Sequence, residues 1–88
     1  MSDPKPLLEF PCHFPIKAIG KDADNFQAIV VEIVRRHVPD LDDHAITQRP
    51  SHGGKYIAVT AAFTAESQAQ LDALYRELTA HTQVLMVL

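Results

Sequence analysis

The alternation of apolar and polar residues along the chain predicts four β-strands, over residues 14–20, 45–51, 55–64 and 83–88. The third strand has the most regular pattern, because its larger apolar side chains occupy every second position and should face the helices. They are Ile57, Val59, Ala61 and Phe63. Pro50 cannot donate a hydrogen bond to a neighbouring strand, so the second strand is expected at an edge of the sheet.

Helical spacing of apolar residues predicts a first helix after Gly20. Its apolar stripe begins at Phe26, and the helix is expected to end near His37 because Pro39 disfavours the helical conformation of the residue before it. The carboxylate of Asp22 or Asp24 is expected to cap its amino end.

A second helix is predicted between Thr64, as its amino-terminal cap, and His81. The resulting order, βαββαβ, is typical of the α+β class and of a ferredoxin-like two-layer sandwich. Right-handed crossovers give a four-stranded antiparallel sheet of order 4-1-3-2 with both helices on one face. We expect the proline-rich residues 1–13 to form an extended arm and residues 14–88 to form the domain.

Composition argues against several function classes. The net charge of −3 gives no general attraction to phosphates, so nucleic acid is not an expected partner. No apolar run approaches the roughly 20 residues that span a membrane, and the amino-terminal residues lack a secretion signal. The single cysteine, Cys12, excludes an internal disulfide and fits a cytoplasmic protein.

The candidate catalytic and metal-binding residues do not form a known motif. The histidines are His13, His37, His44, His52 and His81. Their spacing matches no metal-binding pattern, and one cysteine cannot supply a thiolate site. Cys12 and His13 are sequence neighbours in an extended segment, so their side chains should point in opposite directions rather than form a nucleophile–base pair. We therefore expect neither catalysis nor a metal or cofactor.

RNA-recognition domains share this fold, so RNA binding is an alternative, although a more distant one. Those domains stack bases on two or three exposed aromatic rings of the sheet. The third strand here offers one, Tyr56, and the first strand adds only Phe14 at its edge.

The segment after the first strand is a candidate ligand site. It comprises Gly20, Lys21, Asp22, Asp24 and Asn25. A glycine allows close approach of the backbone to a ligand, and the nearby helix amino terminus favours an anionic group, whereas the two aspartates favour an amino group. An ordinary helix-start turn is the alternative interpretation of the same residues.

Five features of the chain occur together and in a specific order. They are Leu7-Leu8-Glu9-Phe10-Pro11, Gly20, Val34-Arg35-Arg36-His37-Val38-Pro39, Leu74-Tyr75-Arg76-Glu77-Leu78 and Met86-Val87-Leu88. In this combination the chain resembles the YbeD family of small bacterial proteins of unassigned function. The resemblance implies a ferredoxin-like fold similar to the ACT-type regulatory domains of amino-acid-metabolising enzymes. It also implies a regulatory or ligand-sensing role and a connection with lipoate metabolism.

The leading hypothesis is a non-enzymatic, cytoplasmic module that associates with itself or with a metabolic enzyme, tuned by a small ligand near Gly20. The chain ends in an apolar strand that topology places at a sheet edge, where an uncovered strand promotes association. The expected interface residues are Val84, Met86, Leu88, Tyr56 and Ile19.

The alternative hypothesis is a ligand-independent adaptor that binds proteins through the same edge or through the open face of the sheet. The residues expected on that face are Lys17, Ile19, Tyr56 and Thr60.

Overall fold

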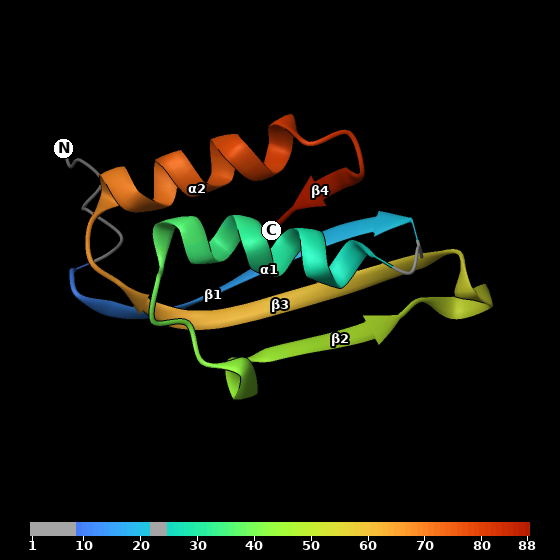
Figure 1. Cartoon of the computed structure of the whole chain (residues 1–88), viewed down its shortest axis with the longest axis horizontal. Helices are drawn as coiled ribbons and strands as arrows, with labels where there is room; N and C mark the ends of the chain where they lie inside the picture. Colours follow the sequence, from blue (N-terminus) through green and yellow to red (C-terminus); the bar gives the residue numbers. More distant parts are fainter. Residues whose placement is uncertain (1–8, 22–24) are drawn as a thin grey trace, which may run out of the picture.

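The computed structural model describes residues 9–21 and 25–88 of the chain, which form one four-stranded antiparallel sheet with two helices on one side of it (Figure 1). The strands are β1 (Cys12–Lys21), β2 (Ile46–Pro50), β3 (Tyr56–Ala65) and β4 (Val84–Val87). The helices are α1 (Phe26–His37) and α2 (Gln68–Ala80), with short 3-10 turns at Asp43–Ala45 and His52–Gly54. The βαββαβ order and the sheet order β2-β3-β1-β4 confirm the predicted ferredoxin-like fold.

The sheet is built around the long central pair of β1 and β3. These strands pair over ten residues, from Cys12 opposite Ala65 to Lys21 opposite Tyr56. β1 therefore begins two residues earlier than its predicted start at Phe14. β2 pairs only with β3, which confirms the edge position that Pro50 predicts.

The core lies between the helices and the inner face of the sheet. The alternation predicted for β3 is confirmed, because its four larger apolar side chains are buried against the helices. The helices contribute their apolar stripes to the same core, and burial of these side chains from water is the main force that holds the two layers together. The buried helical residues are Phe26, Val30, Ile33, Val34, Leu71, Leu74 and Leu78.

The amino ends of both helices differ from the sequence-based prediction. α2 is capped by Ser67, whose hydroxyl accepts a hydrogen bond of 3.1 Å from the backbone N–H of Gln70. The prediction that Thr64 is this cap was wrong, because β3 continues to the buried Ala65 before the chain turns. α1 has Asn25 at its cap position, without a side-chain cap hydrogen bond.

β4 contains a β-bulge at Leu85. Val84 lies opposite Gly20 and Met86 lies opposite Ile19, so β4 uses one residue more than β1 over this step. In a regular strand, residues 84 and 86 would share a face, because side chains alternate. The bulge instead turns Val84 into the core, where it is 8% exposed, and leaves Met86 52% exposed.

Candidate functional site

The face of the sheet opposite the helices is uncovered within the described part of the chain (Figure 1). Its residues are those that alternate with the buried positions of each strand, and we call them the open face. On β1 and β3 they are His13, Pro15, Lys17, Ile19, Lys21, Tyr56, Ala58, Thr60, Ala62 and Thr64, and on the edge strands they are Thr47, Arg49, Met86 and Leu88.

Cross-strand pairing joins the open-face residues into rows. Met86 lies opposite Ile19, which lies opposite Ala58 on the other side of β1, and Ala58 in turn lies opposite Arg49. Directly opposite residues in antiparallel strands point to the same face, so this row forms a continuous aliphatic surface that ends at an arginine.

The adjacent row is anchored by the pairing of Lys17 with Leu88. The backbone N–H of Lys17 donates to the carbonyl of Leu88 at 3.1 Å, and the N–H of Leu88 donates to the carbonyl of Lys17 at 2.8 Å. Leu88 therefore continues the ladder beyond Val87 and presents its side chain, 57% exposed, on the open face.

The exposed large hydrophobic side chains of the described residues gather on this surface. Tyr56, Met86 and Leu88 belong to the open face, and Leu85 lies beside it in the bulge of β4. Ile19 is half-buried between Met86 and Ala58. Four of the five predicted interface residues therefore share one surface.

Val84 is the fifth predicted interface residue, and the structure places its side chain in the core opposite Gly20. The residue that sequence reasoning did not single out is Leu85, which is 55% exposed. The sequence pattern did not predict that Val84 is buried while Leu85 is exposed, because an unbroken apolar run fits a bulged strand and a regular strand equally well.

The open face is hollowed near its centre and toward β2. Lys17, Arg49, Ala58 and Thr60 are among the residues that line this hollow, which has a volume of about 420 Å³. Its two cationic side chains make it a surface that attracts anionic groups.

The predicted ligand segment after β1 is only partly within the described residues, since Asp22 and Asp24 lie outside them. Lys21 ends β1 as an exposed residue, and Asn25 occupies the cap position immediately before α1. A β-carbon on Gly20 would lie 2.3 Å from Cε1 of Phe26 and 2.4 Å from the carbonyl oxygen of Gln83. The glycine thus permits close packing of the chain against itself at this position.

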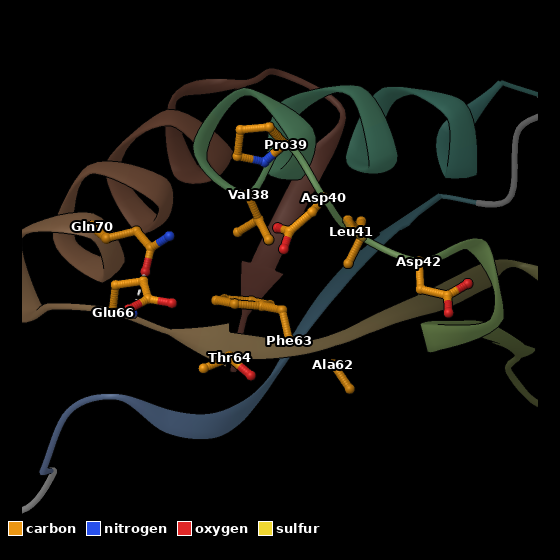
Figure 2. A pocket seen from close by; sticks show the side chains of 10 residues that line it. All are labelled: Val38, Pro39, Asp40, Leu41, Asp42, Ala62, Phe63, Thr64, Glu66 and Gln70. Atoms are coloured by element: carbon orange, nitrogen blue, oxygen red, sulfur yellow. Dashed lines mark hydrogen bonds between the residues drawn. The ribbon is translucent and has the colours of Figure 1, made fainter.

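A second hollow, of about 260 Å³, lies where the end of α1, the end of β3 and the start of α2 meet (Figure 2). Asp40 lies between Val38 and Leu41 in this view, with the ring of Phe63 below them. Three carboxylates, those of Asp40, Asp42 and Glu66, are among the residues lining the hollow.

Hydrogen bonds within the protein engage the polar wall of this second hollow, and one of them joins the two helices. Gln70 Oε1 accepts a hydrogen bond of 2.7 Å from the backbone N–H of Glu66, and Gln70 Nε2 donates one of 2.8 Å to the carbonyl of His37. Asp42 Oδ1 accepts from the backbone N–H of His44 at 2.9 Å. Across residues 9–21 and 25–88, no three His, Cys, Asp or Glu side chains are grouped as a metal ion requires.

A charged cluster links the two helices on their solvent side. His37 Nε2 lies 2.7 Å from Oε1 of Glu77, and Arg36 forms ion pairs with both Glu77 and Glu32. Because 40 residues separate His37 from Glu77, sequence spacing could not reveal this contact. The cluster accounts for the histidine at the end of α1 as an interhelical link.

Cys12 and His13 lie at the start of β1. Cys12 is half-buried against the core, whereas His13 is exposed on the open face. Their side chains therefore point to opposite sides of the sheet, as the extended conformation predicts.

Neither helix in the described part of the chain has the length and apolar character needed to cross a bilayer.

Comparison with known proteins finds relatives over nearly the whole chain. The family described as "Protein of unknown function (DUF493)" matches residues 5–88. A "UPF0250 protein" of Chromobacterium violaceum is 47% identical over 89 residues and covers 100% of both chains. A "UPF0250 protein" of Neisseria gonorrhoeae is 48% identical over 82 residues, which are 93% of this chain and 90% of the relative.

Among solved structures, the solution structure of protein HP0495 from H. pylori superposes with a TM-score of 0.70. The match covers 96% of this chain and 88% of that one at 13% sequence identity. This likeness supports the ferredoxin-like architecture.

Proposed function

The chain belongs to the DUF493 family of proteins of unknown function, and we propose that it is a non-enzymatic module that associates with another protein through the open face and the β4 edge. The observation that carries this proposal is the gathering of Tyr56, Met86 and Leu88 on one uncovered surface, with Leu85 beside them. Apolar patches on the surface of a folded protein commonly mark sites of association.

The position of β4 supports the same proposal. β4 pairs with β1 on one side, and no strand of the described part of the chain lies on its other side. The edge carries neither a charged side chain nor a proline, the usual means by which proteins prevent pairing at an edge. A partner that covers the edge would remove apolar surface from water and satisfy the outward backbone groups together.

The arrangement of three potentially reactive side chains supports the non-enzymatic part of the proposal. His37 is held by Glu77, and Cys12 and His13 point to opposite sides of the sheet. The resemblance to ACT-type regulatory domains favours a metabolic enzyme as the partner, in lipoate or amino-acid metabolism, and the unpaired Cys12 favours the cytoplasm as the compartment.

A small ligand near Gly20 remains a separate prediction. The Phe26 ring and the Gln83 carbonyl fill the space next to Gly20, so the geometry supports protein association better than a ligand cradled against this glycine. Titration with lipoate and amino acids, followed by amide NMR shifts, tests the ligand. Shifts clustered at Gly20, Lys21 and Asn25 would support it, and shifts absent from these residues would contradict it.

Photo-crosslinking in cells tests the proposed association. A photoreactive amino acid at Met86 should give discrete protein adducts, whereas the same residue at Ala28, which is exposed on α1, should not. Identical adducts from both positions, or none from Met86, would refute the assignment of the open face. Circular dichroism of both variants establishes that they are folded.

A further inference from the structure

Among the residues that the structure describes, the charged side chains of the open face are all of one sign. Lys17 and Lys21 project from β1 and Arg49 projects from β2, and all three are exposed. None of the open-face residues is an aspartate or a glutamate. The surface is therefore cationic, although the chain as a whole has a net charge of −3.

The described acidic residues lie elsewhere, on the helices and in the loops. Asp40, Asp42 and Glu66 line the hollow between the helix ends, and Glu32 and Glu77 pair with Arg36. This segregation of charge distinguishes the open face from the remainder of the surface. It gives the open face a preference for negatively charged groups that the overall charge of the chain does not predict.

The cations surround the aliphatic row rather than forming a separate patch. Lys17 and Lys21 flank Ile19 along β1 at a distance of roughly 7 Å each, as two residues of a strand span. Arg49 lies at the end of the row that begins at Met86, about 10 Å from β1 across two strand spacings.

We infer that the partner presents an acidic segment in which carboxylates flank aliphatic side chains. This inference rests on the proposed function, because it names the chemistry of the partner for the same surface. The aliphatic side chains would contact Ile19 and Met86, while the carboxylates reach Lys17, Lys21 and Arg49. The guanidinium of Arg49 can hold a carboxylate with two hydrogen bonds.

A second copy of this chain, docked through its own open face, would not present such an acidic segment. Two open faces in contact would bring Lys17, Lys21 and Arg49 of both copies into one interface in which no open-face residue is acidic, and such a concentration of like charge opposes association. Nucleic acid fits less well than an acidic protein, because Tyr56 is the one phenyl or phenol ring of the open face and stacking surfaces use two or three rings.

Defined peptides test the charge of the partner. The probe is a soluble peptide with a Glu-Leu-Glu-Ile-Glu centre, the matched peptide has lysine in place of each glutamate, and an oligothymidylate represents nucleic acid. We expect the glutamate peptide to shift the amides of Lys17–Lys21 and Met86–Leu88. Its affinity should fall as salt is raised and exceed that of the lysine peptide by roughly tenfold, as several exposed charge pairs allow.

Charge reversal supplies the matched control. Lys17→Glu should lower the affinity for the glutamate peptide by about threefold to tenfold. Arg76→Glu makes the same change in net charge on the exposed surface of α2 and should leave the affinity unchanged.

Three results would overturn the inference. The first is binding of the lysine peptide that equals or exceeds binding of the glutamate peptide, and the second is stronger shifts of the same amides with oligothymidylate. The third is a concentration-dependent shift of these amides without any peptide, which would identify a second copy of the chain as the occupant. If the glutamate peptide fails while Met86 still crosslinks to a protein, the charge assignment is wrong and the proposed function stands. If both fail, the proposed function is wrong as well.

Discussion

The ring of Phe26 occupies the space that a β-carbon on residue 20 would need, since Cε1 of Phe26 would lie 2.3 Å from such an atom. The backbone carbonyl of Gln83 would lie at 2.4 Å on the other side. Both distances are well below van der Waals contact, so this contact between β1, α1 and the segment before β4 requires a glycine.

Gly20→Ala is therefore expected to destabilise the protein by about 2–3 kcal/mol, because the carbonyl of Gln83 belongs to the backbone and cannot move aside freely. Urea denaturation measures the loss. Gly53→Ala is the comparison, because residue 53 has open space around its Cα but a φ of 81°. Its cost should be about 1 kcal/mol, and an equal or larger loss than that of Gly20→Ala would contradict the packing argument.

Truncation of Val84 should lower stability much more than truncation of Met86, although the two residues lie only two positions apart on one strand. Val84→Ala removes buried methyl groups and should cost about 1–2 kcal/mol of unfolding free energy. Met86→Ala removes an exposed side chain and should change stability by less than about 0.5 kcal/mol. Chemical denaturation of both variants checks this, and similar losses for the two would show that the bulge does not separate their roles.

The cap of α2 can be assigned by removing one hydroxyl at a time. Ser67→Ala should cost about 1 kcal/mol, because the N–H of Gln70 loses its acceptor. Thr64→Val removes the hydroxyl that sequence reasoning assigned to this role and keeps a branched side chain, so it should change stability by less than about 0.5 kcal/mol. Thermal and urea unfolding decide between them, and a larger loss for Thr64→Val would restore the original assignment.

The cap of α2 illustrates which features of the fold the sequence pattern can predict and which it cannot. The alternation from Ile57 to Phe63 predicted which side chains of that strand are buried, and Pro50 predicted an edge position for the second strand, because burial and hydrogen bonding act locally at those positions. The sheet order itself followed from the βαββαβ order of the elements and right-handed crossovers. The cap was misassigned because the strand continues to Ala65, and only its burial against the core decides that boundary. The Ser-x-x-Gln spacing of residues 67–70, a known capping pattern, was the signal that could have corrected it.

The candidate site was predictable in part from the topology of the sheet. Tyr56, Ile19 and Met86 share a face because strand pairing brings them together, and the predicted topology already implied that pairing. The inward turn of Val84 depends on a bulge, and the link between His37 and Glu77 depends on the packing of two helices. Neither is encoded in the spacing of residues along the chain.

Removing the charge of Glu77 should weaken the contact between the helices. Glu77→Gln is expected to cost about 0.5–1 kcal/mol, since its side chain is partly exposed and pairs with both Arg36 and His37. The loss should shrink at high salt, because screening already weakens the pairs in the parent protein. Urea unfolding at low and high salt measures it. Asp72→Asn, on the exposed face of α2, should have little effect at either salt concentration.

The bulge at Leu85 also determines how the chain tolerates a change in length. Because Val84 and Met86 already face opposite sides with one residue between them, deletion of Leu85 leaves a regular strand in which Val84 still meets Gly20 and Met86 still meets Ile19. Deletion of Val87 would instead move Leu88 into the inward position opposite Ala18. Within this short strand, a homologue one residue shorter would keep the same outward surface only if the residue was lost at the bulge.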